Sequence, residues 1–185
     1  MAKVLGKAPS AWRAEMARWS DGGIVEQLDD ATVGGWRVDD EARILLSEVG
    51  LPAWDSFFAR CPQEAGEPLY PPFYILGREV VEEHQHEPFI DLRCGCGYFG
   101  LSAADGGVWQ VFGDGGGLPV NTTLALFYYF LDKVAGSSPQ QNSDIPERQS
   151  MKRAETVMRR LIQRDPILTS GADNFWGYVF DRPWG

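Results

Sequence analysis

The sequence predicts an α+β fold, in which a mainly antiparallel sheet of about 4 to 6 strands is flanked by helices. Three observations predict it. Segments rich in aromatic and β-branched residues follow one another between residues 73 and 112. The connections between them are mostly too short for the crossover that a parallel pair of strands needs. Apolar residues at helical spacing precede and follow this region.

The beginning of the chain is predicted to be a helical extension. Apolar side chains in residues 11–19 recur at helical spacing, at Trp12, Met16 and Trp19. Such a stripe must be buried against another part of the protein. We therefore expect residues 1–37 to be packed on a main domain that spans residues 38–185.

A second helix is expected at the start of the main domain. The carboxylate of Asp39 or Asp40 can accept hydrogen bonds from the amides of its first turn. Gly50 suits the left-handed turn that ends a helix, and Pro52 prevents continuation. The proline-rich residues 59–72 that follow are expected to form a loop.

The predicted sheet comes next in the chain. Its expected strands cover residues 73–81, 89–94, 98–103 and 108–112. Cys94–Gly97 is predicted to be one turn, and Asp105–Gly107 a hairpin-like turn. Gly113–Gly117 is predicted to be a flexible loop, because it lacks the Gly-Lys-Ser/Thr ending of a phosphate-binding loop.

Two helices are expected after the sheet. Asn121 or Thr122 is predicted to cap a helix over residues 124–131, which is apolar nearly all round and is therefore expected to be buried. A basic amphipathic helix is predicted over residues 146–164, where Asp144 and Glu147 resemble a capping box. We expect its basic residues to form a solvated face.

The charge distribution favours a basic partner. The net charge is −9, from 17 basic and 26 acidic residues. Residues 21–60 contain nine acids and three bases, and residues 61–146 contain eleven acids and three bases, whereas both ends of the chain are mildly basic. An acidic body of this kind repels nucleic acid and anionic membranes and attracts basic surfaces.

Cysteine usage and hydropathy indicate a cytoplasmic protein. The three cysteines, Cys61, Cys94 and Cys96, have no framework spacing. The first ten residues lack the apolar core of a signal peptide. No window approaches the roughly 20 apolar residues that a membrane-spanning helix needs.

Beyond these patterns, the order of several short motifs is similar to that of a known family. The motifs are Leu45–Pro52, Tyr74–Gly77, Ile90–Leu92, Gly106–Val108, Val120–Leu124 leading to Phe127, Asp165–Pro166 and Phe175–Trp176. Their order and spacing resemble the SUKH superfamily of bacterial immunity proteins, in particular its actinobacterial-type branch. Three stretches look particular to this chain: His84–His86, Cys94–Gly97 and Gly113–Gly117.

The resemblance implies a protein that binds and neutralises a cognate polymorphic toxin without chemistry of its own. Many such toxins are nucleases or nucleic-acid deaminases with a basic cleft, which an acidic protein can approach and occlude. The candidate toxin-binding residues are five acids of the sheet region and two aromatic anchors: Glu79, Glu82, Glu83, Asp105, Asp114, Trp109 and Tyr98. Core packing is the alternative for both aromatic residues, and the oligomeric state is left open.

Enzyme function is the main competing hypothesis. His84, His86, Cys94 and Cys96 have donor types that zinc accepts and could serve a small metal-dependent hydrolase. Their one-residue spacing differs from that of usual structural zinc sites, and the histidines lie in an acidic stretch. No catalytic motif or cofactor motif is present, so we expect neither a cofactor nor a catalytic residue. A regulatory interaction module of the same fold, without a toxin partner, is a further alternative.

Overall fold

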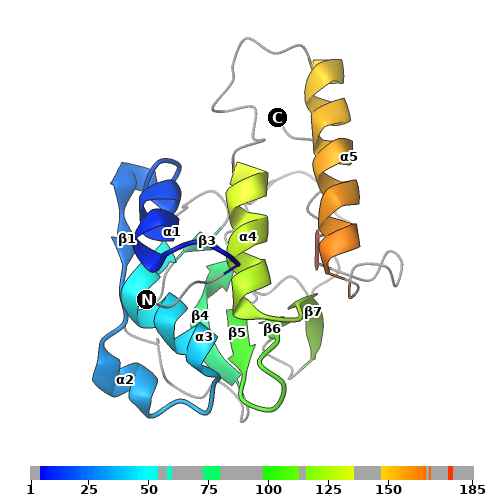
Figure 1. Ribbon diagram of the computed structural model, residues 1–185. Coiled ribbons are helices and arrows are strands. Elements are labelled where there is room, and N and C mark those ends of the chain that lie inside the picture. Colours follow the sequence, from blue (N-terminus) through cyan, green and yellow to red (C-terminus); the bar gives the residue numbers. More distant parts are fainter. Residues whose placement is uncertain are drawn as a thin grey trace, which may run out of the picture.

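The computed structural model in Figure 1 describes residues 5–53, 58–59, 73–79, 98–112, 116–135, 147–165, 167 and 175–176. Its helical elements are α1 (Pro9–Met16), η1 (Asp21–Gly23), α2 (Asp30–Gly34), α3 (Asp40–Ile44), η2 (Leu45–Val49), α4 (Leu124–Ala135) and α5 (Glu147–Arg164). Its strands are β1 (Val25–Glu26), β2 (Leu51–Pro52), β3 (Phe58–Ala59), β4 (Phe73–Glu79), β5 (Tyr98–Ser102), β6 (Val108–Val111) and β7 (Gly117–Asn121).

Within the described residues, the strands form two antiparallel sheets. The larger sheet has five strands in the order β3-β4-β5-β6-β7, and the smaller one pairs β1 with β2. Helices α1, α3 and α4 lie on one side of the larger sheet (Figure 1). The predicted α+β class and antiparallel sheet are therefore confirmed. The strand expected at residues 89–94 lies outside the described residues. The loop expected at residues 59–72 also lies outside them except for Ala59, which belongs to strand β3 and not to a loop.

One apolar core joins the N-terminal helix, the sheet and α4. Trp12 and Met16 of α1 are buried in it, and so is Trp19 just past the helix end, as the predicted stripe requires. Pro9 opens α1 at a position where a missing amide proton costs nothing. On α4, Phe127 packs against Phe99 of β5, with 5.5 Å between the ring centroids. The boundary predicted near residue 37 stays a prediction.

The helix ends follow the predicted chemistry in part. Asp39 caps α3, because its Oδ1 accepts a hydrogen bond of 2.7 Å from the amide of Ala42. The caps proposed for α4, Asn121 and Thr122, are wrong. The cap is Thr123, whose Oγ1 accepts a hydrogen bond of 3.2 Å from the amide of Leu126.

Strand β7 is a second difference from the sequence-based expectation. Gly117 was expected in a loop and Asn121 at a helix cap, yet both belong to this strand. Glycine and proline are depleted in strands, so the sequence Gly-Leu-Pro-Val-Asn does not indicate a strand. In the described sheet β7 lies at an edge, where Pro119 is tolerated beside a shift in register.

Asn121 belongs instead to a buried polar cluster that holds the end of the described chain. Its Nδ2 donates to Oδ2 of Asp165 over 3.1 Å, and its Oδ1 accepts from Nε1 of Trp176 over 3.1 Å. The same Asp165 oxygen accepts from the amide of Thr122, and Oδ1 accepts from the amide of Ile167. Asn121, Asp165 and Trp176 are fully buried. The cluster therefore fixes the segment after α5 to the junction of β7 and α4.

Helix α5 has the predicted amphipathic character. Leu161 is buried, and Val157, Met158 and Ile162 are partly buried against the core. Arg159 and Arg160 are exposed, and Arg159 pairs with Glu155 one turn earlier over 3.5 Å. Arg164 lies over the ring of Tyr129 of α4, 4.8 Å from its centroid. These positions agree with a basic face turned to solvent.

Tyr128 of α4 provides a first test of the core. Its hydroxyl is the one fully buried side-chain polar atom without a hydrogen-bond partner among the described residues. Replacing it in Tyr128→Phe is expected to raise the free energy of unfolding by about 1 kcal/mol near neutral pH, because an unpaired buried hydroxyl is removed. Urea denaturation measures the change, and Tyr129→Phe, at a half-buried ring, is the control.

The same pair of variants reports an alkaline effect. Burial raises the pKa of Tyr128 above its ordinary value of 10.0. The folded protein therefore keeps the proton after the unfolded chain has released it. The stability that this represents is fully present below pH 10 and falls above it, by about 1.4 kcal/mol per pH unit. Tyr128→Phe lacks this loss, so its advantage over the natural protein should widen above pH 10. An advantage that stays constant with pH would contradict the buried position of the hydroxyl.

Candidate partner-binding surface

The strand register places the two predicted aromatic anchors on the same face of the larger sheet. Tyr98 of β5 is opposite Val111 of β6, and Gly100 is opposite Trp109. The core residues Phe99, Leu101 and Val108 occupy the alternate positions and point to the side of α4. Tyr98 and Trp109 therefore lie on the face turned away from α4. Both are half-buried, and neither belongs to the core under that helix.

The ring of Trp109 has glycine neighbours on both adjacent strands. Gly100 lies opposite it on β5. On β7, a Cβ atom added to Gly117 would stand 3.7 Å from Cε3 of the Trp109 ring. Because Gly100 has no side chain, the ring of Phe73 on β4 can reach over it. The Phe73 and Trp109 centroids are 6.1 Å apart in a tilted arrangement. Adding a Cβ at Gly100 would place it 3.1 Å from Cβ of Phe73.

The polar edge of Trp109 lies beside the predicted acid Asp105. Nε1 of Trp109 and Oδ1 of Asp105 are both 3.2 Å from the point where a Cβ of Gly107 would stand. The indole N–H donates no hydrogen bond to any residue that the structure describes. Asp105 is exposed, and its Oδ1 accepts a hydrogen bond of 3.0 Å from the amide of Gly107. The turn between β5 and β6 thus holds a carboxylate next to an available donor.

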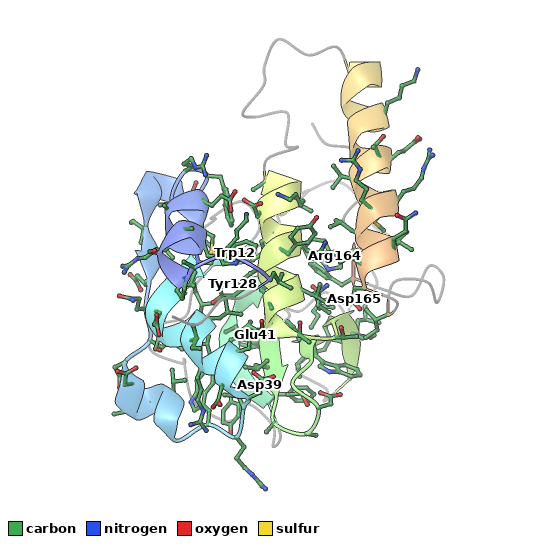
Figure 2. All side chains as sticks on the ribbon, viewed as in Figure 1. Trp12, Asp39, Glu41, Tyr128, Arg164 and Asp165 are labelled. Atoms are coloured by element: carbon green, nitrogen blue, oxygen red, sulfur yellow. The ribbon has the colours of Figure 1, made fainter. Side chains whose placement is uncertain are left out.

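A second carboxylate reaches this turn from the helical side. The connection between α2 and α3 is fixed to β4, because Trp36 stacks on Tyr74 with 4.5 Å between centroids. The amide of Arg37 also donates to the Tyr74 hydroxyl over 2.8 Å. Asp39, which follows, has its Oδ2 4.0 Å from the Cβ position of Gly106. Figure 2 labels Asp39 at the end of α3 nearest the β5–β6 turn.

In each of the two carboxylates, one oxygen accepts a hydrogen bond from a backbone amide of the protein itself. Oδ1 of Asp39 caps α3, and Oδ1 of Asp105 holds its own turn. The second oxygen of each accepts no hydrogen bond and forms no ion pair within the described residues. Arg43 donates to the carbonyl of Trp36, so it is engaged elsewhere. We call Phe73, Trp109, Asp39 and Asp105 the Trp109 surface.

Three of the seven predicted binding residues can thus be placed: Tyr98, Trp109 and Asp105. Tyr98 and Trp109 share one face of the sheet. Asp105 lies in the β5–β6 turn beside Trp109, at the opposite end of β5 from Tyr98. Glu79 ends β4, but its side chain is outside the described part of the structure. Glu82, Glu83 and Asp114 also lie outside the described residues. The proposed contacts of these seven residues with a toxin stay predictions.

The alternative metal cluster also falls outside the described residues, at His84, His86, Cys94 and Cys96. Among the residues that are described, no group of three or more metal-binding side chains occurs. The hydrolase hypothesis therefore gains no support from the geometry, and it also loses none.

The sequence-based search missed Phe73, Gly100 and Asp39 as parts of this surface. Asp39 was recognised only as a helix cap, and its position 66 residues before Asp105 gave no sign that the two carboxylates would flank one turn. A glycine that follows two aromatic residues within a strand, as in Tyr-Phe-Gly-Leu, was an available signal. Such glycines are often covered by an aromatic side chain from a neighbouring strand.

Comparison with known protein families identifies the family of this chain. The family model of the SUKH-4 immunity proteins matches residues 11–182. Comparison with curated proteins and with solved structures found no match. In the described part of the chain, no helix is both long and apolar enough to cross a membrane. The matched region includes most of α1, both sheets, α4 and α5, as well as the Trp109 surface. The chain therefore belongs to the SUKH-4 immunity protein family.

Proposed function

We propose that this protein is a cytoplasmic immunity protein that binds a cognate polymorphic toxin and blocks its active site. The family match over residues 11–182 carries the proposal. The more specific part of the proposal, that the toxin is a nuclease or a nucleic-acid deaminase, is based on the negative charge of this protein. A net charge of −9 suits a partner with a basic, nucleic-acid-binding cleft. Occlusion requires binding alone, so the protein needs no catalytic group of its own.

The Trp109 surface is our proposed centre of the contact. Binding energy at protein interfaces is concentrated in a few residues, among which tryptophan and tyrosine are enriched. Trp109 and Tyr98 lie on one sheet face, and Trp109 is opposite Gly100 on β5 and Pro119 on β7. The exposed carboxylate of Asp105 lies beside the indole edge of Trp109, and the exposed carboxylate of Asp39 approaches the same turn from the helical side. Contacts of Glu79, Glu82, Glu83 and Asp114 with the toxin are also part of the proposal. Assignment to the actinobacterial-type branch is part of the proposal.

Binding and rescue test the proposed function directly. The partner to use is the C-terminal domain encoded immediately upstream of this gene. We expect tight, salt-sensitive binding and survival of cells that produce both proteins. Absence of both binding and rescue would contradict the toxin assignment. Metal analysis of the purified protein would then be the next measurement.

Charge reversal tests which acids matter. Asp40→Lys with Asp105→Lys is expected to slow association at least about tenfold at low salt, because Asp105 belongs to the Trp109 surface and Asp40 directly follows Asp39, which also belongs to it. The matched control is Asp30→Lys with Glu48→Lys, which changes the net charge equally. Asp30 and Asp40 are each the first residue of a short helix, so the helix-dipole effects also match. Equal slowing in both variants would indicate general attraction without a defined surface.

A further inference from the structure

We propose that Asp21 is a site of spontaneous isoaspartate formation, a slow modification of the protein's own backbone. The tripeptide Asp-Gly-Gly occurs in two turns that the structure describes, Asp21–Gly23 and Asp105–Gly107. A third copy begins at Asp114, outside the described residues. The two described turns have the same reacting groups but hold them differently. The reaction needs no partner, so it is independent of the proposed function.

The modification joins a backbone amide to the carboxyl group that precedes it. The nitrogen of Gly22 forms a bond to the side-chain carboxyl carbon of Asp21, and the amide proton leaves with the carboxyl hydroxyl as water. Water then opens the cyclic imide at either of its carbonyl carbons. Opening on the side-chain side restores aspartate, whereas opening on the main-chain side gives isoaspartate, in which the chain runs through the side chain. Glycine favours the attack, because no Cβ shields its nitrogen.

In the first turn, the attacking amide is exposed and makes no hydrogen bond. Asp21, Gly22 and Gly23 are all exposed to solvent. The amide of Gly23 donates to the carbonyl of Ser20 over 2.9 Å, and the amide of Ile24 donates to the carbonyl of Asp21 over 3.1 Å. The amide of Gly22, between them in the chain, donates to no acceptor within the described residues. Its nitrogen is therefore available to the neighbouring carboxyl group.

In the second turn, the same atoms are held in hydrogen bonds. The amide of Gly106, whose nitrogen would attack, donates to the carbonyl of Ser102 over 3.0 Å. Oδ1 of Asp105 accepts a hydrogen bond of 3.0 Å from the amide of Gly107, which directs the carboxyl group past Gly106. Gly106 is half-buried and Gly107 is buried. Reaction at Asp105 therefore requires the turn to open first, which costs free energy.

Isoaspartate at residue 21 would alter the connection between α1 and the small sheet. The amide of Asp21 donates to the carbonyl of Ala53 over 2.8 Å, and the amide of Ala53 donates to the carbonyl of Ile24 over 3.1 Å. The extra main-chain carbon of isoaspartate lies between these two hydrogen bonds. Both can persist only if the glycine turn rearranges, next to the buried Trp19.

Oxygen-18 exchange tests the assignment on the whole folded protein. The protein is aged near neutral pH in water enriched in oxygen-18, so that each opening of the imide leaves a labelled oxygen at that residue. Digestion in ordinary water and fragmentation mass spectrometry then give the label at each aspartate. We expect the label at Asp21 to exceed that at Asp105 at least about fivefold, because only the second turn must open. In urea, the two should differ by less than about twofold, since the unfolded tripeptides are equivalent.

Asp21→Glu is the matched variant, because it keeps the charge but would have to close a larger ring, which forms more slowly. Label at residue 21 should be lost in this variant, while Asp105 in the same molecule is the internal reference. Asp30, which is exposed and followed by alanine, gives the background. Equal label at Asp21 and Asp105 in the folded protein would overturn the assignment, and so would label at Asp21 no higher than at Asp30. An excess at Asp21 that persisted unchanged in urea would also contradict it, since the fold would then have no part in the selection.

Discussion

Gly50→Ala is expected to lower the free energy of unfolding by about 4 kcal/mol, the sum of a strained backbone and an overpacked contact. Gly50 follows η2 and has φ 92° and ψ 174°, a conformation that is essentially restricted to glycine. An added Cβ would stand 2.5 Å from the carbonyl oxygen of Glu26 and 2.8 Å from the amide nitrogen of Gln27. These are backbone atoms of β1 and the residue after it, so relief requires moving the small sheet.

Gly34→Ala is the matched control for this prediction. Gly34 is the last residue of α2 and is exposed, and an added Cβ would meet nothing within 4 Å. Alanine there should be neutral or stabilising by up to about 1 kcal/mol, because it favours the helix. Urea denaturation of both variants gives the comparison. If the free energy of unfolding of Gly50→Ala lay within about 1 kcal/mol of that of the natural protein, the close approach of β1 to residue 50 would be wrong.

Asp165→Ala should be similarly costly, at about 3 to 5 kcal/mol, because it leaves the buried side-chain donor of Asn121 and two partly buried backbone amides without an acceptor. The side chain accepts from Nδ2 of Asn121 and from the amides of Thr122 and Ile167. Asp165 and Asn121 are fully buried, so water cannot easily replace the lost acceptor. Denaturant unfolding measures the loss.

A donor–acceptor exchange distinguishes this cluster from simple loss of packing. Asn121→Asp keeps the shape but turns a second buried carboxylate toward Asp165, so it should cost about 2 kcal/mol or more. Adding Asp165→Asn restores a donor–acceptor pair at that contact. The double variant should therefore be more stable than Asn121→Asp alone, a coupling that a double-mutant cycle measures. Strictly additive effects would show that the bond between residues 121 and 165 contributes nothing.

The fold was largely predictable because its helices and central strands follow simple periodicities. The buried stripe of Trp12 and Met16 and the cap at Asp39 could be identified from spacing and side-chain chemistry alone. Strand β7 could not, because Gly117 and Pro119 disfavour strands and only pairing with β6 holds them there. Asn121 was mistaken for a cap because a local role was available, whereas its actual partner lies 44 residues further along the chain.

The sequence predicted individual residues of the candidate surface but not how they are arranged. Trp109 and Asp105 were chosen for their chemistry, and the sequence offered no way to decide which face Trp109 occupies. The register with Gly100 decides it. The position of Asp39 near the turn that contains Asp105 depends on the stacking of Trp36 on Tyr74, a contact between residues 38 positions apart in the sequence. Such contacts depend on the whole fold and leave no local pattern.

The buried cluster around Asp165 and Trp176 has a consequence for protein synthesis. Trp176 packs against Phe127 and Phe130 of α4, and its indole N–H satisfies Asn121. A nascent chain that has not reached residue 176 lacks both contacts, although every strand and helix up to α5 has already been made. Contacts between distant segments must wait until both are available. Stable folding on the ribosome is thereby delayed until residue 176 is free, and so is any binding that needs the finished sheet.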